Sequence, residues 1–143
     1  RLMDNLGGLS PLVCREAALF ASGDVDARIG DWMNRPHQRW TITAVPEAGG
    51  YLGGQYYKIC IEGTERVLAA SEGAEVITVP AYTGAPEQLW RIEQLTDGTY
   101  RIMPKSVPGT KGHFVLTSVA DSTPSLAQYN FDNDNCKWNM IRK

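Results

Sequence analysis

The sequence has few of the features on which nucleic-acid binding or membrane insertion depend. Its 143 residues carry 14 Lys and Arg against 16 Asp and Glu, which gives a net charge of −2. This balance creates no basic field for phosphate backbones, so nucleic acid is not an expected partner. No apolar run approaches the roughly 20 residues that a membrane-spanning helix needs, so membrane insertion is not expected either.

Cysteine and histidine are also scarce. Cys14, Cys60 and Cys136 are too few for a disulfide framework and lack the C-x-x-C spacing of a zinc site, although one pair could still close. The only histidines, His37 and His113, lie in no motif that would organise a nucleophile or a metal. We therefore expect no enzyme activity in this chain, no metal site and no cofactor.

Glycine and proline, in contrast, are spread through the whole chain. Fourteen Gly and eight Pro separate short apolar runs instead of gathering in one linker. This distribution is typical of many short strands joined by turns, and the length suits one domain. The sequence thus predicts one all-β domain over residues 1–143. Because the chain starts at Arg1 in mid-pattern, without an initiator Met, we expect it to be a fragment of a longer protein.

A motif ending in tryptophan recurs with a period of about 50 residues. Gln38-Arg39-Trp40 returns as Gln88-Leu89-Trp90 and Cys136-Lys137-Trp138, so the tryptophans are 50 and 48 residues apart. An aromatic residue precedes each Trp by eight or nine positions, namely Trp32, Tyr82 and Tyr129. The repeat predicts three units, here named lobes 1, 2 and 3, with approximate bounds 1–48, 49–97 and 98–143.

Alternating apolar residues predict four strands in each lobe. In lobe 2 they cover 57–61, 66–69, 76–79 and 90–93. The first of them, Tyr57-Lys58-Ile59, resembles Tyr100-Arg101-Ile102, and Arg1-Leu2 is expected at the same place in lobe 1. Three such units around a pseudo-three-fold axis would close a six-stranded barrel capped at one end by three hairpins.

On these motifs the chain resembles the ricin-B family of β-trefoil lectins, whose Gln-x-Trp triplets recur once per lobe. The resemblance implies that the three Trp are core residues and that the Gln secures the backbone of its lobe. It also implies non-catalytic carbohydrate binding by a shallow pocket on each lobe, where an aromatic ring stacks on a sugar and Asp, Asn and Gln bind hydroxyls. A secreted or extracellular protein, a glycan partner and a fused glycan-active domain follow as expectations.

The candidate carbohydrate-binding residues lie ahead of the triplets. Lobe 3 ranks first, because its aromatic residue adjoins a run rich in Asn and Asp, and lobe 1 ranks second. Lobe 2 ranks last because its loop has few polar side chains. The candidates are Asp121, Tyr129, Asn133 and Asn135 in lobe 3, Asp31, Trp32 and Asn34 in lobe 1, and Tyr82 in lobe 2.

One departure from the family bears on the sugar. Galactose-binding lobes of the family usually carry an Asp just after the apolar pair of the second strand. The expected counterparts are Leu12-Val13-Cys14, Val67-Leu68-Ala69 and Val115-Leu116-Thr117, and none carries it, although Asp121 could substitute in lobe 3. One alternative is a β-trefoil that binds protein, as a protease inhibitor or assembly module, with the loop 105–113 as the segment that would fill a partner's cleft. The other is a purely structural spacer domain.

Overall fold

The computed structural model describes residues 9–10, 12–14, 17–22, 26–31, 38–48, 50–51, 54–72, 75–109, 114–119, 123–130 and 136–140. These residues form strands, turns and two short 3-10 helices, η3 (Pro46–Ala48) and η5 (Pro86–Gln88), and among them no helix is long and apolar enough to cross a membrane. The strands are β1 (Leu9–Ser10), β2 (Leu12–Cys14), β3 (Ala17–Ser22), β4 (Asp26–Asp31), β5 (Trp40–Ala44), β6 (Gly50–Tyr51), β7 (Gly54–Ile61), β8 (Val67–Ser71), β9 (Glu75–Val79), β10 (Trp90–Gln94), β11 (Tyr100–Pro104), β12 (Phe114–Val119), β13 (Thr123–Gln128) and β14 (Asn139–Met140).

Antiparallel pairings join the first and fourth strands of the lobes into a closed ring. Strand β1 pairs with β5, β5 with β7, β7 with β10, and β10 with β11. A bridge between Tyr100 and Trp138 then links β11 to the last strand, and β14 returns to β2, which continues β1. The ring is a barrel, in which every strand has neighbours on both sides.

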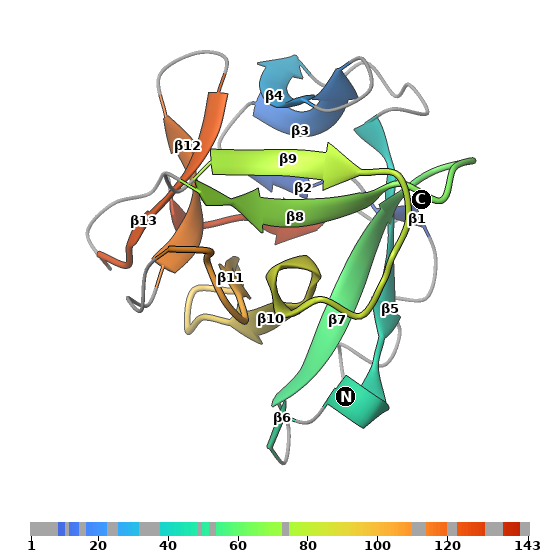
Figure 1. Ribbon diagram of the computed structural model, residues 1–143. Helices are drawn as coiled ribbons and strands as arrows, with labels where there is room; N and C mark the ends of the chain where they lie inside the picture. The colour runs from blue at the N-terminus through green and yellow to red at the C-terminus, as the bar shows by residue number, and fades with distance from the viewer. Residues whose placement is uncertain are drawn as a thin grey trace.

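The second and third strands of each lobe form three hairpins outside this ring. They are β3–β4, β8–β9 and β12–β13, and Figure 1 shows β8–β9 in the centre of the view, with β3–β4 above it and β12–β13 at its left. The hairpins touch one another through their third strands, because Asp26 of β4 pairs with Ile77 and Ser125 of β13 pairs with Glu75. A barrel capped by three hairpins that contact one another is a β-trefoil, as the repeat predicted.

The three tryptophans occupy equivalent places in the core. Trp40, Trp90 and Trp138 are each 0% exposed. Each indole Nε1–H donates a hydrogen bond to a backbone carbonyl in the second strand of its own lobe: Leu19 O at 3.1 Å, Leu68 O at 2.9 Å and Leu116 O at 2.9 Å. A buried indole is stable only when its N–H has an acceptor, so this bond ties each hairpin to the barrel.

These bonds correct the predicted alignment of lobe 1. Because Trp40 is bonded to Leu19, the second strand of this lobe is β3, and Ala18-Leu19-Phe20 is the counterpart of Val67-Leu68-Ala69. The expected counterpart, Leu12-Val13-Cys14, is instead part of the first strand: Leu12 pairs with Met140 as Ile59 pairs with Ile42. Arg1-Leu2, which was expected there, lies outside the described residues.

Candidate functional site

Two of the predicted sugar-stacking aromatics, Tyr82 and Tyr129, lie beyond the third strands of lobes 2 and 3, one position apart in the repeat. Tyr82 follows β9 and Tyr129 follows β13, and each side chain is partly exposed. A partly exposed ring on an ordered loop is the arrangement that stacking on a sugar needs. These two residues are therefore the described part of the candidate site.

A cation lies over each of these rings. Lys58 Nζ is 5.2 Å from the centroid of the Tyr82 ring, and Arg101 Cζ is 5.0 Å from the centroid of Tyr129. Both distances fall within the range of a cation–π interaction. The prediction from sequence did not include Lys58 or Arg101 in the site, because they are 24 and 28 residues before the rings that they contact.

The buried Gln88 of the second triplet fixes the loop that carries Tyr82. Its Oε1 accepts a hydrogen bond from the backbone N–H of Thr83 at 2.8 Å and from Thr83 Oγ1 at 3.3 Å. Thr83 is the next residue after Tyr82, so the bond restrains the ring through one peptide unit. The implied role of Gln in holding the backbone of its lobe is confirmed in lobe 2.

Lobe 3 has no such amide at the equivalent place. Cys136 is fully buried, and its Sγ lies 3.6 Å from Thr117 Oγ1, which also donates to Val115 O at 3.0 Å. A thiol is only a weak hydrogen-bonding group, so this contact ties the motif to the second strand of the lobe instead of to the loop of the aromatic. Cys60 and Cys136 are both free thiols.

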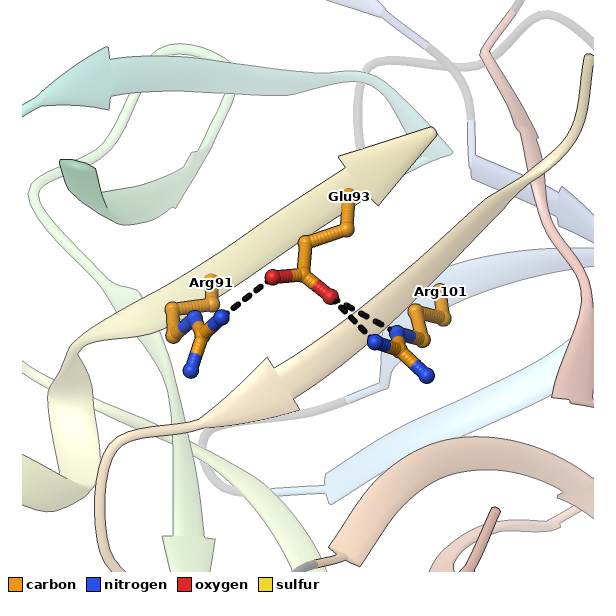
Figure 2. A network of polar contacts seen from close by, with 3 residues as sticks. All are labelled: Arg91, Glu93 and Arg101. Atoms are coloured by element: carbon orange, nitrogen blue, oxygen red, sulfur yellow. Dashed lines mark hydrogen bonds and ion pairs between the residues drawn. The ribbon is translucent and has the colours of Figure 1, made fainter. Parts of the chain in front are cut away.

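Arg101 is held over Tyr129 by an acidic residue on the neighbouring strand. Its Nε donates to Glu93 Oε1 at 2.8 Å, and its Nη2 lies 2.6 Å from the same oxygen. Arg91 pairs with the other oxygen of Glu93, so one carboxylate lies between two guanidinium groups (Figure 2). This network fixes the direction of the Arg101 side chain from β11 toward the ring.

The positions where galactose-binding lobes of the family carry Asp are closed to solvent here. Ala69 is 1% exposed and Thr117 is 4% exposed. In lobe 1 the corrected alignment puts Phe20 at the equivalent position, so this lobe also lacks the Asp. In lobes 2 and 3 these positions therefore cannot offer an acceptor to a ligand.

The remaining predicted site residues cannot be placed in the same detail. Asp31 is the last residue of β4, but its side chain is not described. Trp32, Asn34, Asp121, Asn133 and Asn135 lie outside the described residues, as do His37 and His113. Within the part of the chain that the structure describes, no group of His, Cys, Asp and Glu could hold a metal ion.

The fold has close counterparts among solved structures. A designed three-fold symmetric protein, ThreeFoil, superposes with a TM-score of 0.74 at 20% identity, covering 94% of this chain and 99% of its own. A mosquitocidal holotoxin gives a TM-score of 0.77 at 18% identity, covering 96% of this chain but 17% of the toxin. At such identities the likeness concerns the fold alone. No curated protein sequence matches this chain significantly.

The sequence profile of the ricin-type β-trefoil lectin domain-like family matches residues 36–111, which include two of the three triplets and the whole of lobe 2. Lectin domains of this type bind carbohydrates in general and are typically non-catalytic. The repeat, the closed barrel with its three hairpins and the profile match agree, and the chain belongs to the ricin-type β-trefoil lectin domain-like family.

Proposed function

We propose that this chain is a non-catalytic carbohydrate-binding module that takes up sugars in shallow pockets on its lobes. In each pocket an aromatic ring stacks on the apolar face of the sugar: Trp32 in lobe 1, Tyr82 in lobe 2 and Tyr129 in lobe 3. The polar groups that orient the sugar are Asp31 and Asn34 in lobe 1, and Asp121, Asn133 and Asn135 in lobe 3.

The observation that carries this proposal is the repeated placement of Tyr82 and Tyr129. Both are partly exposed, both follow the third strand of a lobe, and both have a basic side chain about 5 Å from the ring, at 5.2 and 5.0 Å. Exposure and a nearby cation are not enough, since Tyr56 has both, but only Tyr82 and Tyr129 of these three rings follow a third strand. The same arrangement in two lobes supports a common use.

A weak pocket repeated in several lobes suits a targeting role. Single shallow sites bind weakly, and several sites on one rigid body gain avidity on a surface that displays many copies of a sugar. We therefore assign to the chain the task of holding a secreted, glycan-active protein on its substrate outside the cell. The described start of the loop 105–113 favours this over protease inhibition, because Val107 is buried and Lys105 N–H donates to Leu89 O at 2.8 Å.

A glycan array probed with the chain and its variants tests the proposal. Tyr129→Ala and Tyr82→Ala are expected to weaken binding to the best glycan about tenfold in the lobe affected, since ring stacking is lost. Tyr129→Phe and Tyr82→Phe keep the stacking face and should retain most of the affinity.

Tyr56→Ala is the matched control. Tyr56 is also a partly exposed tyrosine with a cation over its ring, Lys105 Nζ at 4.9 Å, but it lies in β7 and not after a third strand. Its loss should leave glycan binding unchanged. Absence of binding to every glycan on the array, with the wild-type chain folded, would refute the proposed function.

A further inference from the structure

The two cations over the rings occupy the same position of the repeat. Tyr57, just before Lys58, pairs with Trp90 of its lobe, and Tyr100, just before Arg101, pairs with Trp138. Ile59 follows Lys58 and Ile102 follows Arg101, and both isoleucines are 0% exposed and fill the barrel. Strand alternation then turns Lys58 and Arg101 outward, toward the aromatic of the same lobe.

A cation on a ring face affects neutral and acidic sugars differently. A sugar that stacks on that face must displace the cation and lose the cation–π attraction. A neutral sugar offers the displaced cation only hydroxyl oxygens as acceptors, and these hydrogen bonds are weaker than those to an anion. A sugar with a carboxylate or sulfate at its rim compensates, because the displaced cation pairs with the anion through a charge-assisted hydrogen bond.

The two lobes differ in how freely the cation can make this exchange. Arg101 is held in place by Glu93, which also pairs with Arg91 (Figure 2). Lys58 forms no ion pair with any of the described residues, and its contact with Tyr82 is made by a flexible side chain that ends in a compact charge. Lobe 2 therefore has a cation that can swing from the ring to an anion.

The surroundings of Tyr82 supply few acceptors for neutral sugars: in the described loop 80–89, besides Tyr82 itself, only Thr83 and Glu87 have side-chain oxygens that are not buried. Gln88 restrains the loop through Thr83, and the Asp position of galactose-binding lobes is Ala69, which is buried. Beside such a loop the ammonium group of Lys58 is a charged group close to the ring that could orient a ligand.

We propose that lobe 2 is a site for acidic sugars, in which the ring of Tyr82 stacks on the sugar and Lys58 pairs with its carboxylate or sulfate. This inference rests on the proposed carbohydrate binding and names the ligand class of one lobe. It reverses the sequence-based ranking, in which lobe 2 came last. Neutral sugars are expected to bind lobe 2 more weakly than their acidic counterparts.

The test uses pairs of oligosaccharides that differ only in the anionic group: a neutral sugar, the same sugar as its uronic acid, and the same sugar with one sulfate. Binding is measured by calorimetry on a chain carrying Trp32→Ala and Tyr129→Ala, so that lobe 2 is the remaining pocket. We expect this chain to prefer the acidic members about tenfold at low salt, with the preference falling as salt rises. Comparison of the uronic acid with the sulfate shows which anion is preferred.

Lys58→Gln should remove the preference, and Lys58→Arg should keep it. Lys105→Gln is the matched control, since it removes a cation over Tyr56, outside the repeated position, and should leave the preference intact. Equal binding of neutral and acidic sugars, or equal loss in Lys58→Gln and Lys105→Gln, overturns the inference while the proposed function stands. Loss of all glycan binding by the wild-type chain would refute both, and urea unfolding of each variant shows whether it is folded.

Discussion

At the scale of single residues, the environment of each cysteine decides what its thiol can do. Cys136 is fully buried at the place where the other lobes carry Gln, and there it acts as a small core residue in contact with Thr117. Cys60 is partly buried in β7, and burial raises the pKa of its thiol. A raised pKa leaves less thiolate at a given pH, so Cys60 should be a poor nucleophile in the folded chain.

This difference predicts a slow alkylation of Cys60. At pH 8 the native chain should react with iodoacetamide at Cys60 more slowly than the chain unfolded in urea, because the thiol of the unfolded chain has its ordinary, lower pKa. The free energy of unfolding should also fall as pH rises above about 9, since the unfolded state then loses its proton first. Mass spectrometry of the peptide containing Cys60 gives the rate. Equal rates in the native and unfolded chains would contradict the shift.

At the scale of elements, the hairpin β8–β9 of lobe 2 differs from its two counterparts in having a buried polar residue on its third strand. The strand register places Thr78 opposite Leu68, where lobes 1 and 3 have Ile29 and Leu126. Thr78 is 1% exposed, and the guanidinium of Arg66 donates to its side-chain oxygen at 3.2 and 3.1 Å and to its carbonyl at 3.1 Å. A polar side chain at an apolar position of the repeat is thus matched by a basic partner.

Removal of this partner should destabilise the hairpin. Arg66→Ala is expected to lower the free energy of unfolding by about 1 to 2 kcal/mol, because hydrogen bonds from a charged donor to a buried hydroxyl and a carbonyl are lost. Arg66→Lys should recover only part of the loss, since an ammonium cannot reproduce the planar pair of donors.

Urea unfolding of Arg66→Ala, Thr78→Val and the double variant gives the coupling between the two residues. Thr78→Val restores the apolar character found in the other lobes, so Arg66→Ala should cost less in that background. Strictly additive effects of the two substitutions would show that the bond to the hydroxyl contributes nothing.

The elements also show where reasoning from sequence succeeds and where it fails. In lobe 2 the four predicted strands agree with β7, β8, β9 and β10 to within three residues, because clear alternation and turn glycines mark them. In lobe 1 the sequence of the first strand contains Pro11, which interrupts the alternation, and the second strand is rich in alanine, so neither gives a strong pattern. The bond from Trp40 to Leu19 and the pairing of Leu12 with Met140 assign them correctly.

In the candidate site, too, some contacts could be predicted from the sequence and others could not. The spacing before each triplet was sufficient to select Tyr82 and Tyr129, because local spacing is visible in a sequence. Lys58 and Arg101 were not predicted to lie near the rings, although both stand in the similar triplets Tyr57-Lys58-Ile59 and Tyr100-Arg101-Ile102. Their contact with the rings arises from the folding of one strand beside a distant loop, which no local pattern expresses.

At the scale of the whole molecule, closure of the barrel makes the three lobes depend on one another. Each first strand pairs with the fourth strand of its own lobe and with that of the preceding lobe, as β7 does with β10 and β5. The core is correspondingly continuous, with the three Trp and the barrel residues Leu12, Ile59 and Ile102 in one buried cluster. A lobe alone could not bury its apolar face, so the three should unfold together.

The three tryptophans allow this dependence to be tested. Trp40→Ala, Trp90→Ala and Trp138→Ala are each expected to lower the free energy of unfolding by about 3 to 5 kcal/mol, because each indole is fully buried and each makes the same bond to a second strand. Trp→Phe at the same positions keeps a large ring but leaves the carbonyl of Leu19, Leu68 or Leu116 without its donor, and should cost less. The three lobes share one ring of strand pairings, so removal of one indole should weaken all of them together. Every variant should therefore still unfold in a single transition, with the same midpoint by near-UV circular dichroism and by the fluorescence of the remaining tryptophans. A biphasic transition in Trp138→Ala, with lobes 1 and 2 melting separately from lobe 3, would show that the lobes are independent units and that the ring of pairings does not set the stability of the fold.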